Sequence, residues 1–212
     1  MNKKDNAFLK ESLAKPKHIA ILIHYNPDGD AVGSALALSE FLRTKKHDVS
    51  ILSPNPFPDF LQWMPESEKI SVATENLDKC IEKIIRADLI FCVDFNASNR
   101  IGLLQETLEK ATGIKILIDH HIAPSSIFDI YYSVPEGISS TSELIYNFLV
   151  YKLKEQECIT KSMAECLYVG IITDTGSLSY ACNNRSSYAI VGKLIAKGID
   201  GEAIHRKVYD TY

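Results

Sequence analysis

Lys115-Ile116-Leu117-Ile118-Asp119-His120-His121 is the stretch on which both the fold and the functional site depend. Its β-branched and apolar residues are typical of a buried strand in a parallel sheet, and the run ends abruptly in a carboxylate and two imidazoles. Two other apolar runs end in the same way: residues 19–23 lead into His24, and residues 89–93 lead into Asp94. Because α/β folds place their chemistry at the carboxyl ends of such strands, we expect these ends to meet.

Strand and helix patterns alternate along most of the chain. Strands are expected at residues 19–23, 49–52, 89–93, 115–118 and 127–132, and helices at 3–14, 31–45, 77–85, 103–110, 144–153, 160–172 and 186–196. A capping-box pattern from Ser140 to Glu143 opens the helix at 144–153. The alternation predicts an α/β fold with a doubly wound, mainly parallel sheet and flanking helices.

The overall charge and the cysteines limit the function classes. A net charge of −4 on 212 residues argues against general attraction to long nucleic acid or to a membrane surface. An anionic substrate must therefore be held locally, by a few basic side chains or by bound cations. The five cysteines form no CxxC pair, and no apolar run reaches the length of a signal peptide core or a membrane span. We expect a cytoplasmic protein with reduced thiols.

The turn after the first strand, His24-Tyr25-Asn26-Pro27-Asp28-Gly29-Asp30, distinguishes between classes of α/β protein. It has neither the GxGxxG of a dinucleotide site nor the Gly-Lys-Ser or Gly-Lys-Thr of a P-loop. Two carboxylates beside a helix amino terminus would repel a phosphate unless cations lay between them. The DxD of aspartyl-phosphate phosphatases is a rival interpretation, but its nucleophile directly follows the strand. Here four residues intervene, and Pro27 favours an extended backbone before Asp28.

Each acidic residue has an ordinary interpretation when it is taken alone. Asp30 could be a helix N-cap and Asp28 a turn residue. Asp94 and His120, however, each follow a separate expected strand, and Asp174 lies in a Thr-Asp-Thr-Gly turn. Mixed His and Asp ligands without Cys favour Mn²⁺ or Mg²⁺ over a structural zinc ion. Because aspartates that converge on one cleft repel one another, two divalent cations would neutralise them, and we expect a dinuclear centre.

These motifs together resemble the DHH phosphoesterase superfamily. The resemblance rests on four blocks that occur in the family's order: residues 24–31, Val93-Asp94, Asp119-His120-His121 and residues 170–176. Within the superfamily, the sequence is most similar to the bacterial nano-RNases, which also remove the 3′-phosphate of adenosine 3′,5′-bisphosphate. It is less similar to family II pyrophosphatases and RecJ-type exonucleases.

The resemblance implies a hydrolase with two Mn²⁺ ions per chain, with Mg²⁺ as the alternative metal. It assigns ligands to both ions, with one shared carboxylate: His24, Asp28 and Asp94 for the first, and Asp30, Asp94, His120 and Asp174 for the second.

Three further residues receive roles from the resemblance. His121 would contact the scissile phosphate, and Asp119 would orient the pair His120 and His121 from behind. Arg100, six residues beyond Asp94, would contact the substrate.

The resemblance also implies an organisation and a set of substrates. We expect residues 1–185 to form the catalytic domain, and residues 186–212 to form a terminal helix and the start of an interdomain linker. Nothing here matches the glycine-rich second domain of such proteins, so we expect that domain not to be represented. The expected substrates are short oligonucleotides or nucleotide bisphosphates, cleaved by a two-metal-activated hydroxide, and the chain could form a homodimer. The alternatives are an inorganic pyrophosphatase or exopolyphosphatase, and a non-catalytic nucleotide-binding module.

Overall fold

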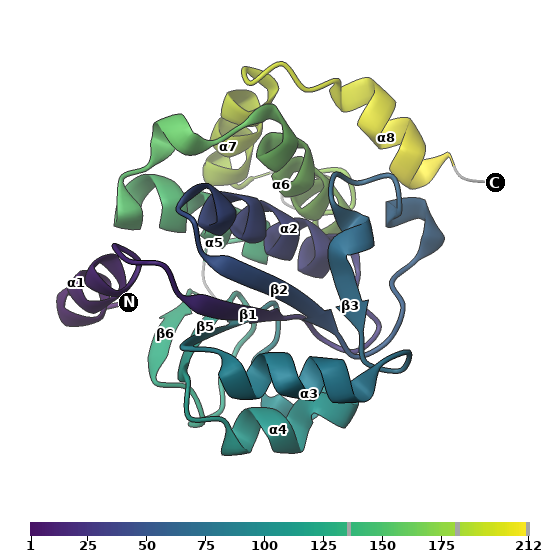
Figure 1. Ribbon diagram of the computed structural model, residues 1–212. Coiled ribbons are helices and arrows are strands. Elements are labelled where there is room, and N and C mark those ends of the chain that lie inside the picture. Colours follow the sequence, from purple (N-terminus) through teal and green to yellow (C-terminus); the bar gives the residue numbers. More distant parts are fainter. Residues whose placement is uncertain (135–136, 181–182, 211–212) are drawn as a thin grey trace.

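A parallel sheet of six strands runs through the middle of the computed structural model, which describes residues 1–134, 137–180 and 183–210 (Figure 1). The strand order is β3-β2-β1-β4-β5-β6, and every neighbouring pair is parallel. The doubly wound parallel sheet expected from the sequence is therefore confirmed. The strands are β1 His18–Leu22, β2 Asp48–Ser53, β3 Ile70–Val72, β4 Leu89–Val93, β5 Ile114–Asp119 and β6 Ile130–Ser133.

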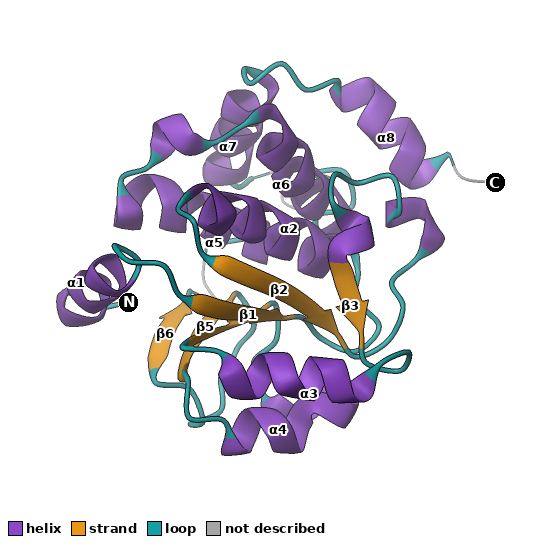
Figure 2. Ribbon diagram, viewed as in Figure 1, coloured by secondary structure: helices purple, strands orange, loops and turns teal. Residues whose placement is uncertain are grey.

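Helices cover both faces of the sheet (Figure 2). One layer contains α2, α5 and α6, with α7 and α8 packed against α6, and the other layer contains α3 and α4. The α-helices are α1 Lys3–Ser12, α2 Gly29–Thr44, α3 Leu77–Arg86, α4 Gln105–Lys110, α5 Thr141–Asn147, α6 Lys161–Asp174, α7 Arg185–Ile195 and α8 Gly201–Tyr209. Short 3₁₀ turns lie at η1 Asp59–Leu61, η2 Ser67–Lys69, η3 Ser98–Leu104 and η5 Gln156–Cys158, and a π-helical turn, η4 Phe148–Leu153, extends α5.

Successive residues of each strand face opposite helical layers. In β1, Ile19 and Ile21 belong to the apolar core beneath α2 and α6, whereas Ala20 and Leu22 belong to the core beneath α3 and α4. A parallel sheet that is buried on both faces needs apolar residues at every position. This requirement explains why the strands appear in the sequence as continuous apolar runs.

The strand order places a topological switch point between β1 and β4. The chain moves outward from β1 to β2 and β3, and then returns to the other side of β1 as β4. Connections diverge at this point, which leaves a crevice beyond the carboxyl ends of the two strands, where α/β proteins bind their ligands.

Close packing of α2 on α6 brings two more chain segments to the same edge. A Cβ atom at Gly33 of α2 would lie 2.3 Å from the carbonyl oxygen of Cys166 in α6, so only glycine permits this approach. Because α2 begins and α6 ends at the carboxyl edge of the sheet, Asp30 and Asp174 lie beside the strand ends.

Several elements differ from the expectation. Strand β3 and helix α8 were not expected, and the expected helix at 103–110 is the turn η3 followed by the shorter α4. Helix α5 begins at Thr141 rather than at residue 144, because the side chain of Ser140 accepts a hydrogen bond from the N–H of Glu143 at 3.2 Å. Among the described residues, no helix is both long enough and apolar enough to span a membrane.

Candidate metal centre

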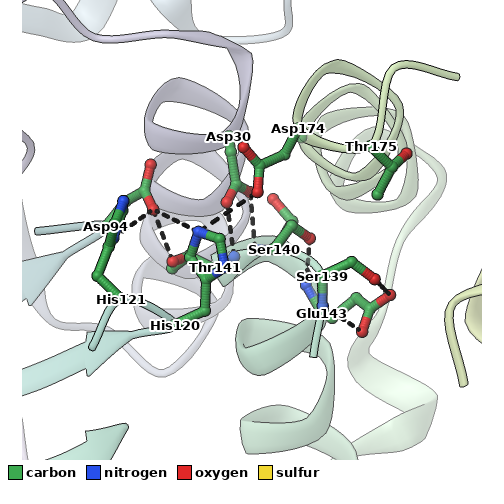
Figure 3. Close-up of polar contacts among 12 residues, drawn as sticks. Asp30, Asp94, His120, His121, Ser139, Ser140, Thr141, Glu143, Asp174 and Thr175 are labelled. Atoms are coloured by element: carbon green, nitrogen blue, oxygen red, sulfur yellow. Dashed lines mark hydrogen bonds and ion pairs between the residues drawn. The ribbon is translucent and has the colours of Figure 1, made fainter. Parts of the chain in front are cut away.

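Imidazole and carboxylate side chains from separate strand ends face one another across the switch point (Figure 3). His24 lies two residues beyond β1, and Asp94 directly follows β4. The Nε2 atom of His24 lies 3.4 Å from Oδ2 of Asp94, and both side chains are almost fully buried. His120, which directly follows β5, reaches the same carboxylate, with its Nε2 atom 3.7 Å from Oδ1 of Asp94.

The first potential ligand group consists of His24, Asp28 and Asp94, whose nearest donor atoms all lie within 4.8 Å of one another. The Nδ1 atom of His24 donates a hydrogen bond to the carbonyl oxygen of Tyr25 at 2.9 Å. A carbonyl can only accept, so Nδ1 carries a proton, and in the neutral imidazole the lone pair is then on Nε2. That lone pair is on the nitrogen that faces the two carboxylates.

Asp28, rather than Asp30, caps α2. Its Oδ1 atom accepts hydrogen bonds from the N–H groups of Asp30 at 2.9 Å and Ala31 at 3.0 Å. The suggested N-cap role of Asp30 is therefore wrong, and Asp30 lies inside the first helical turn with its carboxylate free to face the strand ends.

The second potential ligand group consists of Asp30, His120 and Asp174, again with donor atoms within 4.8 Å. The Nε2 atom of His120 lies 3.3 Å from Oδ2 of Asp174. Asp174 is the last residue of α6 rather than part of a turn, and the rigid helix therefore sets its direction. In Figure 3, the carboxylates of Asp30 and Asp174 lie side by side above His120.

Asp94 lies between the two groups, with Oδ2 facing His24 and Oδ1 facing His120. Its backbone has a φ of 64°, in the left-handed region that non-glycine residues seldom adopt. This conformation turns the chain sharply at the end of β4. The turn leaves the carboxylate beside both His24 and His120.

The acidic side chains repel one another strongly in the absence of a cation. The pKa of Asp30 is raised well above its usual range, mainly by burial and then by the charge of Asp94. The pKa of Asp94 is raised in the same way, mainly by burial and then by the charge of Asp28. Burial and Asp28 raise the pKa of Asp174 to about 6. Divalent cations would reverse these shifts by favouring the ionised carboxylates. The donor set of carboxylate oxygens and imidazole nitrogens fits a hard or borderline divalent cation.

Asp119 and His121 form a hydrogen-bonded pair at the rim of the cluster. The Nδ1 atom of His121 donates to Oδ1 of the fully buried Asp119 at 2.7 Å, and this bond raises the pKa of His121. The described residues show no such bond from Asp119 to His120, so Asp119 orients one imidazole of the pair. The Nδ1 atom of His121 also lies 4.0 Å from Oδ1 of Asp94, close enough for His121 to count among potential metal ligands as well.

Arg100 lies beside the first ligand group. Its carbonyl oxygen accepts a hydrogen bond from the N–H of Tyr25 at 2.7 Å, which joins the loop after β4 to the loop after β1. Together with His24, Asp28 and four neighbours it lines a cavity of about 690 Å³, here called the arginine cavity. The predicted substrate residue therefore lies in a cavity that opens onto the cluster.

The loop after β1 departs from the expected extended backbone. Asn26, which precedes Pro27, has a φ of 55°, in the left-handed region. Asn tolerates this region, and Asn55 stabilises it by accepting from the N–H of Asn26 at 2.7 Å and donating to its side-chain oxygen at 3.0 Å. The resulting turn brings Asp28 back toward His24, with 3.9 Å between Oδ1 and Nε2.

Thr141 is a site residue that the sequence analysis missed. Its hydroxyl donates to Oδ1 of Asp94 at 2.8 Å, and its N–H donates to Oδ2 of Asp30 at 2.5 Å. The N–H of Ser142 donates to the other oxygen of Asp30 at 2.8 Å. The signal was the polar run at the start of α5, which the sequence analysis interpreted only as a capping box. The start of α5 thus holds one carboxylate from each ligand group.

The fold and the cluster define an α/β domain with a carboxylate–imidazole centre at the switch point of a parallel sheet. Residues 18–171 match the family model described as DHH family, N-terminal domain. The match covers more than half of the chain, and the chain therefore belongs to the DHH family of phosphoesterases.

The chain is similar to several individual proteins, in sequence, in structure or in both. The crystal structure of an exopolyphosphatase-related protein from Bacteroides fragilis is 40% identical, with a TM-score of 0.93, over all of this chain and 63% of that chain. The bifunctional oligoribonuclease and PAP phosphatase NrnA of Bacillus subtilis is 26% identical over 89% of this chain and 56% of its own length. RecJ from Thermus thermophilus shares the fold, with 20% identity and a TM-score of 0.57. The chain thus spans little more than half the length of its curated relative from Bacillus subtilis.

Proposed function

We propose that this chain is the phosphoesterase domain of a Mn²⁺-dependent hydrolase that cleaves short oligonucleotides and removes the 3′-phosphate of adenosine 3′,5′-bisphosphate. The observation that carries the proposal is the pair of ligand groups on either side of the buried carboxylate of Asp94, whose oxygens face His24 of one group and His120 of the other. Similarity to NrnA supports the substrate class, and the small negative net charge fits a short substrate better than a long nucleic acid.

Two cations would be held by residues of the two groups: His24, Asp28 and Asp94 on one side, and Asp30, Asp94, His120 and Asp174 on the other. The chemistry that such a pair supplies when bound is a lowered pKa for water and neutralisation of charge at phosphorus. Oxygen and imidazole donors favour Mn²⁺, with Mg²⁺ as the alternative.

His121 would act on the substrate directly. Since its Nδ1 atom is engaged by Asp119, the remaining Nε2–H of the imidazolium can donate a hydrogen bond to a phosphate oxygen. The hydrogen bond to Asp119 raises the pKa of His121 and so favours this charged form over the neutral imidazole. The side chain is 41% exposed, which leaves it accessible to a phosphate in the crevice.

The arginine cavity would hold the part of the substrate on one side of the scissile phosphate. The guanidinium group of Arg100 suits a second phosphate, and the half-exposed ring of Tyr25 lines the same cavity. A nucleotide bisphosphate and a dinucleotide each offer a second phosphate or nucleoside for this space, whereas pyrophosphate offers no nucleoside.

The described thiols of Cys80, Cys92, Cys158 and Cys166 are unpaired, which supports our proposal of a reducing, cytoplasmic location, and Cys182 lies outside the described residues.

Hydrolysis assays with Mn²⁺ test the proposal directly. The purified chain should release nucleoside monophosphate from an RNA dinucleotide and phosphate from adenosine 3′,5′-bisphosphate, and it should cleave pyrophosphate much more slowly. Asp94→Ala should abolish turnover and, by calorimetry, remove both Mn²⁺ sites, because Asp94 belongs to the first ligand group and its Oδ1 atom faces His120 of the second. Preferential cleavage of pyrophosphate would favour the pyrophosphatase alternative. Metal binding without hydrolysis of any of these substrates would favour a nucleotide-binding module.

A further inference from the structure

A second cavity lies at the other ligand group from the one that the arginine cavity adjoins. It measures about 350 Å³ and adjoins the second ligand group through Asp174, and we name it the tyrosine cavity after Tyr180. Its lining residues are Gly137, Ile138, Ser139, Asp174, Thr175, Tyr180 and Asn184. None of the assigned or proposed roles above uses Tyr180 or this cavity.

The ring of Tyr180 is held in place although it is 85% exposed. A Cβ atom at Gly176 would lie 2.5 Å from Cε2 and 2.9 Å from Cδ2 of this ring, so the ring rests directly on the glycine backbone. Gly176 also has a φ of 54°, which other residues adopt at a cost. The N–H of Tyr180 donates to the carbonyl oxygen of Thr175 at 3.0 Å, which fixes the backbone from which the ring projects relative to the end of α6.

Hydrogen bonds hold the facing wall of the tyrosine cavity. The side chain of Asn184 donates to the carbonyl oxygen of Gly137 and to Oγ of Ser139, both at 3.1 Å. The Oγ atom of Ser139 also lies 2.6 Å from Oγ of Ser187, which ties the wall to α7. Both sides of the cavity are thus ordered before a ligand arrives, and this lowers the entropic cost of binding.

The charges of the two cavities indicate different ligands. Among its lining residues the tyrosine cavity has Asp174 as its one charged side chain, whereas both Arg100 and Asp28 line the other cavity. Arg185 lies in an adjoining hollow that shares Tyr180. With an exposed aromatic ring and no basic side chain among its lining residues, the tyrosine cavity suits a neutral, flat group rather than a phosphate.

We propose that the ring of Tyr180 is a stacking platform for one nucleobase of the substrate, while the adjoining phosphate lies at the carboxylate–imidazole cluster. This inference rests on the proposed function and adds the recognition of a base. Every nucleobase has a π-face, so the platform would accept different bases. A base–aromatic stack contributes roughly a 5- to 100-fold gain in affinity.

The test compares Tyr180→Ala, Tyr180→Phe and the control Tyr188→Ala in the full chain with Mn²⁺. Tyr188 is also exposed, at 47%, but it lies on α7 and does not line the cavity. Substrates are an RNA dinucleotide and two analogues that are abasic at one residue or at the other. Tyr180→Ala should lower kcat/KM for the dinucleotide about tenfold, mainly through KM, and the effect should vanish for one abasic analogue. Tyr180→Phe should retain most of the wild-type value.

A binding measurement separates this inference from the proposed function. Calorimetry with adenosine 5′-monophosphate and Mn²⁺ should show about tenfold weaker binding by Tyr180→Ala than by Tyr188→Ala, at unchanged Mn²⁺ affinity. If wild-type protein hydrolyses none of the substrates but this difference persists, the proposed reaction is wrong and the platform stands. If Tyr180→Ala and Tyr188→Ala agree within twofold on the dinucleotide and in nucleotide binding, the platform is refuted.

Discussion

Thr141 shows at the scale of single residues how the cluster is held before any cation binds. Its hydroxyl donates to Asp94 and its N–H to Asp30, so one residue aligns carboxylates from two chain segments. Thr141→Val keeps the shape and removes the hydroxyl, and should weaken Mn²⁺ binding 10- to 100-fold, as is usual when a partner of a metal ligand is lost. Calorimetric Mn²⁺ titration measures this effect. Thr141→Ser is the control and should bind as the wild type does. Equal affinity in the valine variant would show that Asp94 needs no such support.

His121 leads to a second prediction, in which metal binding and turnover separate. His121→Ala removes a proposed hydrogen bond to the phosphate and should lower kcat by roughly 10²–10³, the usual loss for a transition-state contact. Bound Mn²⁺, measured by elemental analysis, should remain at the wild-type stoichiometry. Because Nδ1 of His121 lies 4.0 Å from the carboxylate of Asp94, loss of one ion instead would identify His121 as a ligand.

The sequence was most informative for residues whose position follows from the strand ends. His24, Asp94 and His120 each follow a run that packs as a strand, so the parallel arrangement alone brings them to one edge. Thr141 and Asn26 could not be assigned in this way. Their roles depend on partners distant in the sequence, namely Asp30 and Asp94 for Thr141, and Asn55 for Asn26.

At the scale of elements, the contact between α2, α5 and α6 decides where the acidic groups lie. A Cβ atom at Gly170 of α6 would lie 1.9 Å from Oγ of Ser142 and 2.7 Å from Oδ1 of Asp30. Gly170→Ala must therefore separate the elements, and it should lower the free energy of unfolding by roughly 1–3 kcal/mol and weaken Mn²⁺ binding.

Gly192 offers a matched control on α7, because a Cβ atom there would have no neighbour within 4 Å. Gly192→Ala should raise the free energy of unfolding by roughly 0.5–1 kcal/mol through helix propensity and leave Mn²⁺ binding unchanged. Urea denaturation and calorimetry measure both quantities for the two variants. If both substitutions were stabilising, the α2–α6 contact would be looser than the structure indicates.

Elements were predictable from the sequence where apolar periodicity was long and continuous. Helix α2 packs on several neighbours and has buried residues on nearly every side, and its sequence shows this. Strand β3 has three residues, too few for a period to appear, and it forms because β2 offers it a partner. The π-helical turn η4 lies within the helix expected at 144–153, and its contacts with α1 join segments far apart in the sequence.

At the scale of the whole molecule, strand order determines which ends meet, and strand order was not available from the sequence. The sheet is built so that β1 and β4, far apart in the chain, become neighbours at the switch point. The fold therefore buries carboxylates side by side, and burial first and mutual repulsion second raise the pKa values of Asp30, Asp94 and Asp174 when no cation is present. This unfavourable arrangement of charges depends on the fold of the entire domain, so it should lower the free energy of unfolding of the metal-free chain.

The stability of the metal-free chain should consequently fall as the pH rises. Asp174 has a pKa of about 6 in the folded chain and an ordinary value of about 3.8, which applies to the unfolded chain. Between these two values the folded chain therefore holds a proton on Asp174 that the unfolded chain has lost. The stabilisation from that proton is complete below about pH 4 and is lost as the pH passes through about 6, by an amount of about 1–3 kcal/mol. Asp30 and Asp94 shift in the same direction. Urea denaturation in chelator from pH 4.5 to 7.5 should show the decline, and saturating Mn²⁺ should reverse its slope, because cations bind the ionised carboxylates.

Asp174→Asn gives the decisive comparison at pH 7.5. It should be more stable than the wild type in chelator, where a repelling charge has gone, and less stable in Mn²⁺, where a ligand has gone. The same sign under both conditions would show that the repulsion at this edge of the sheet is not what a cation relieves.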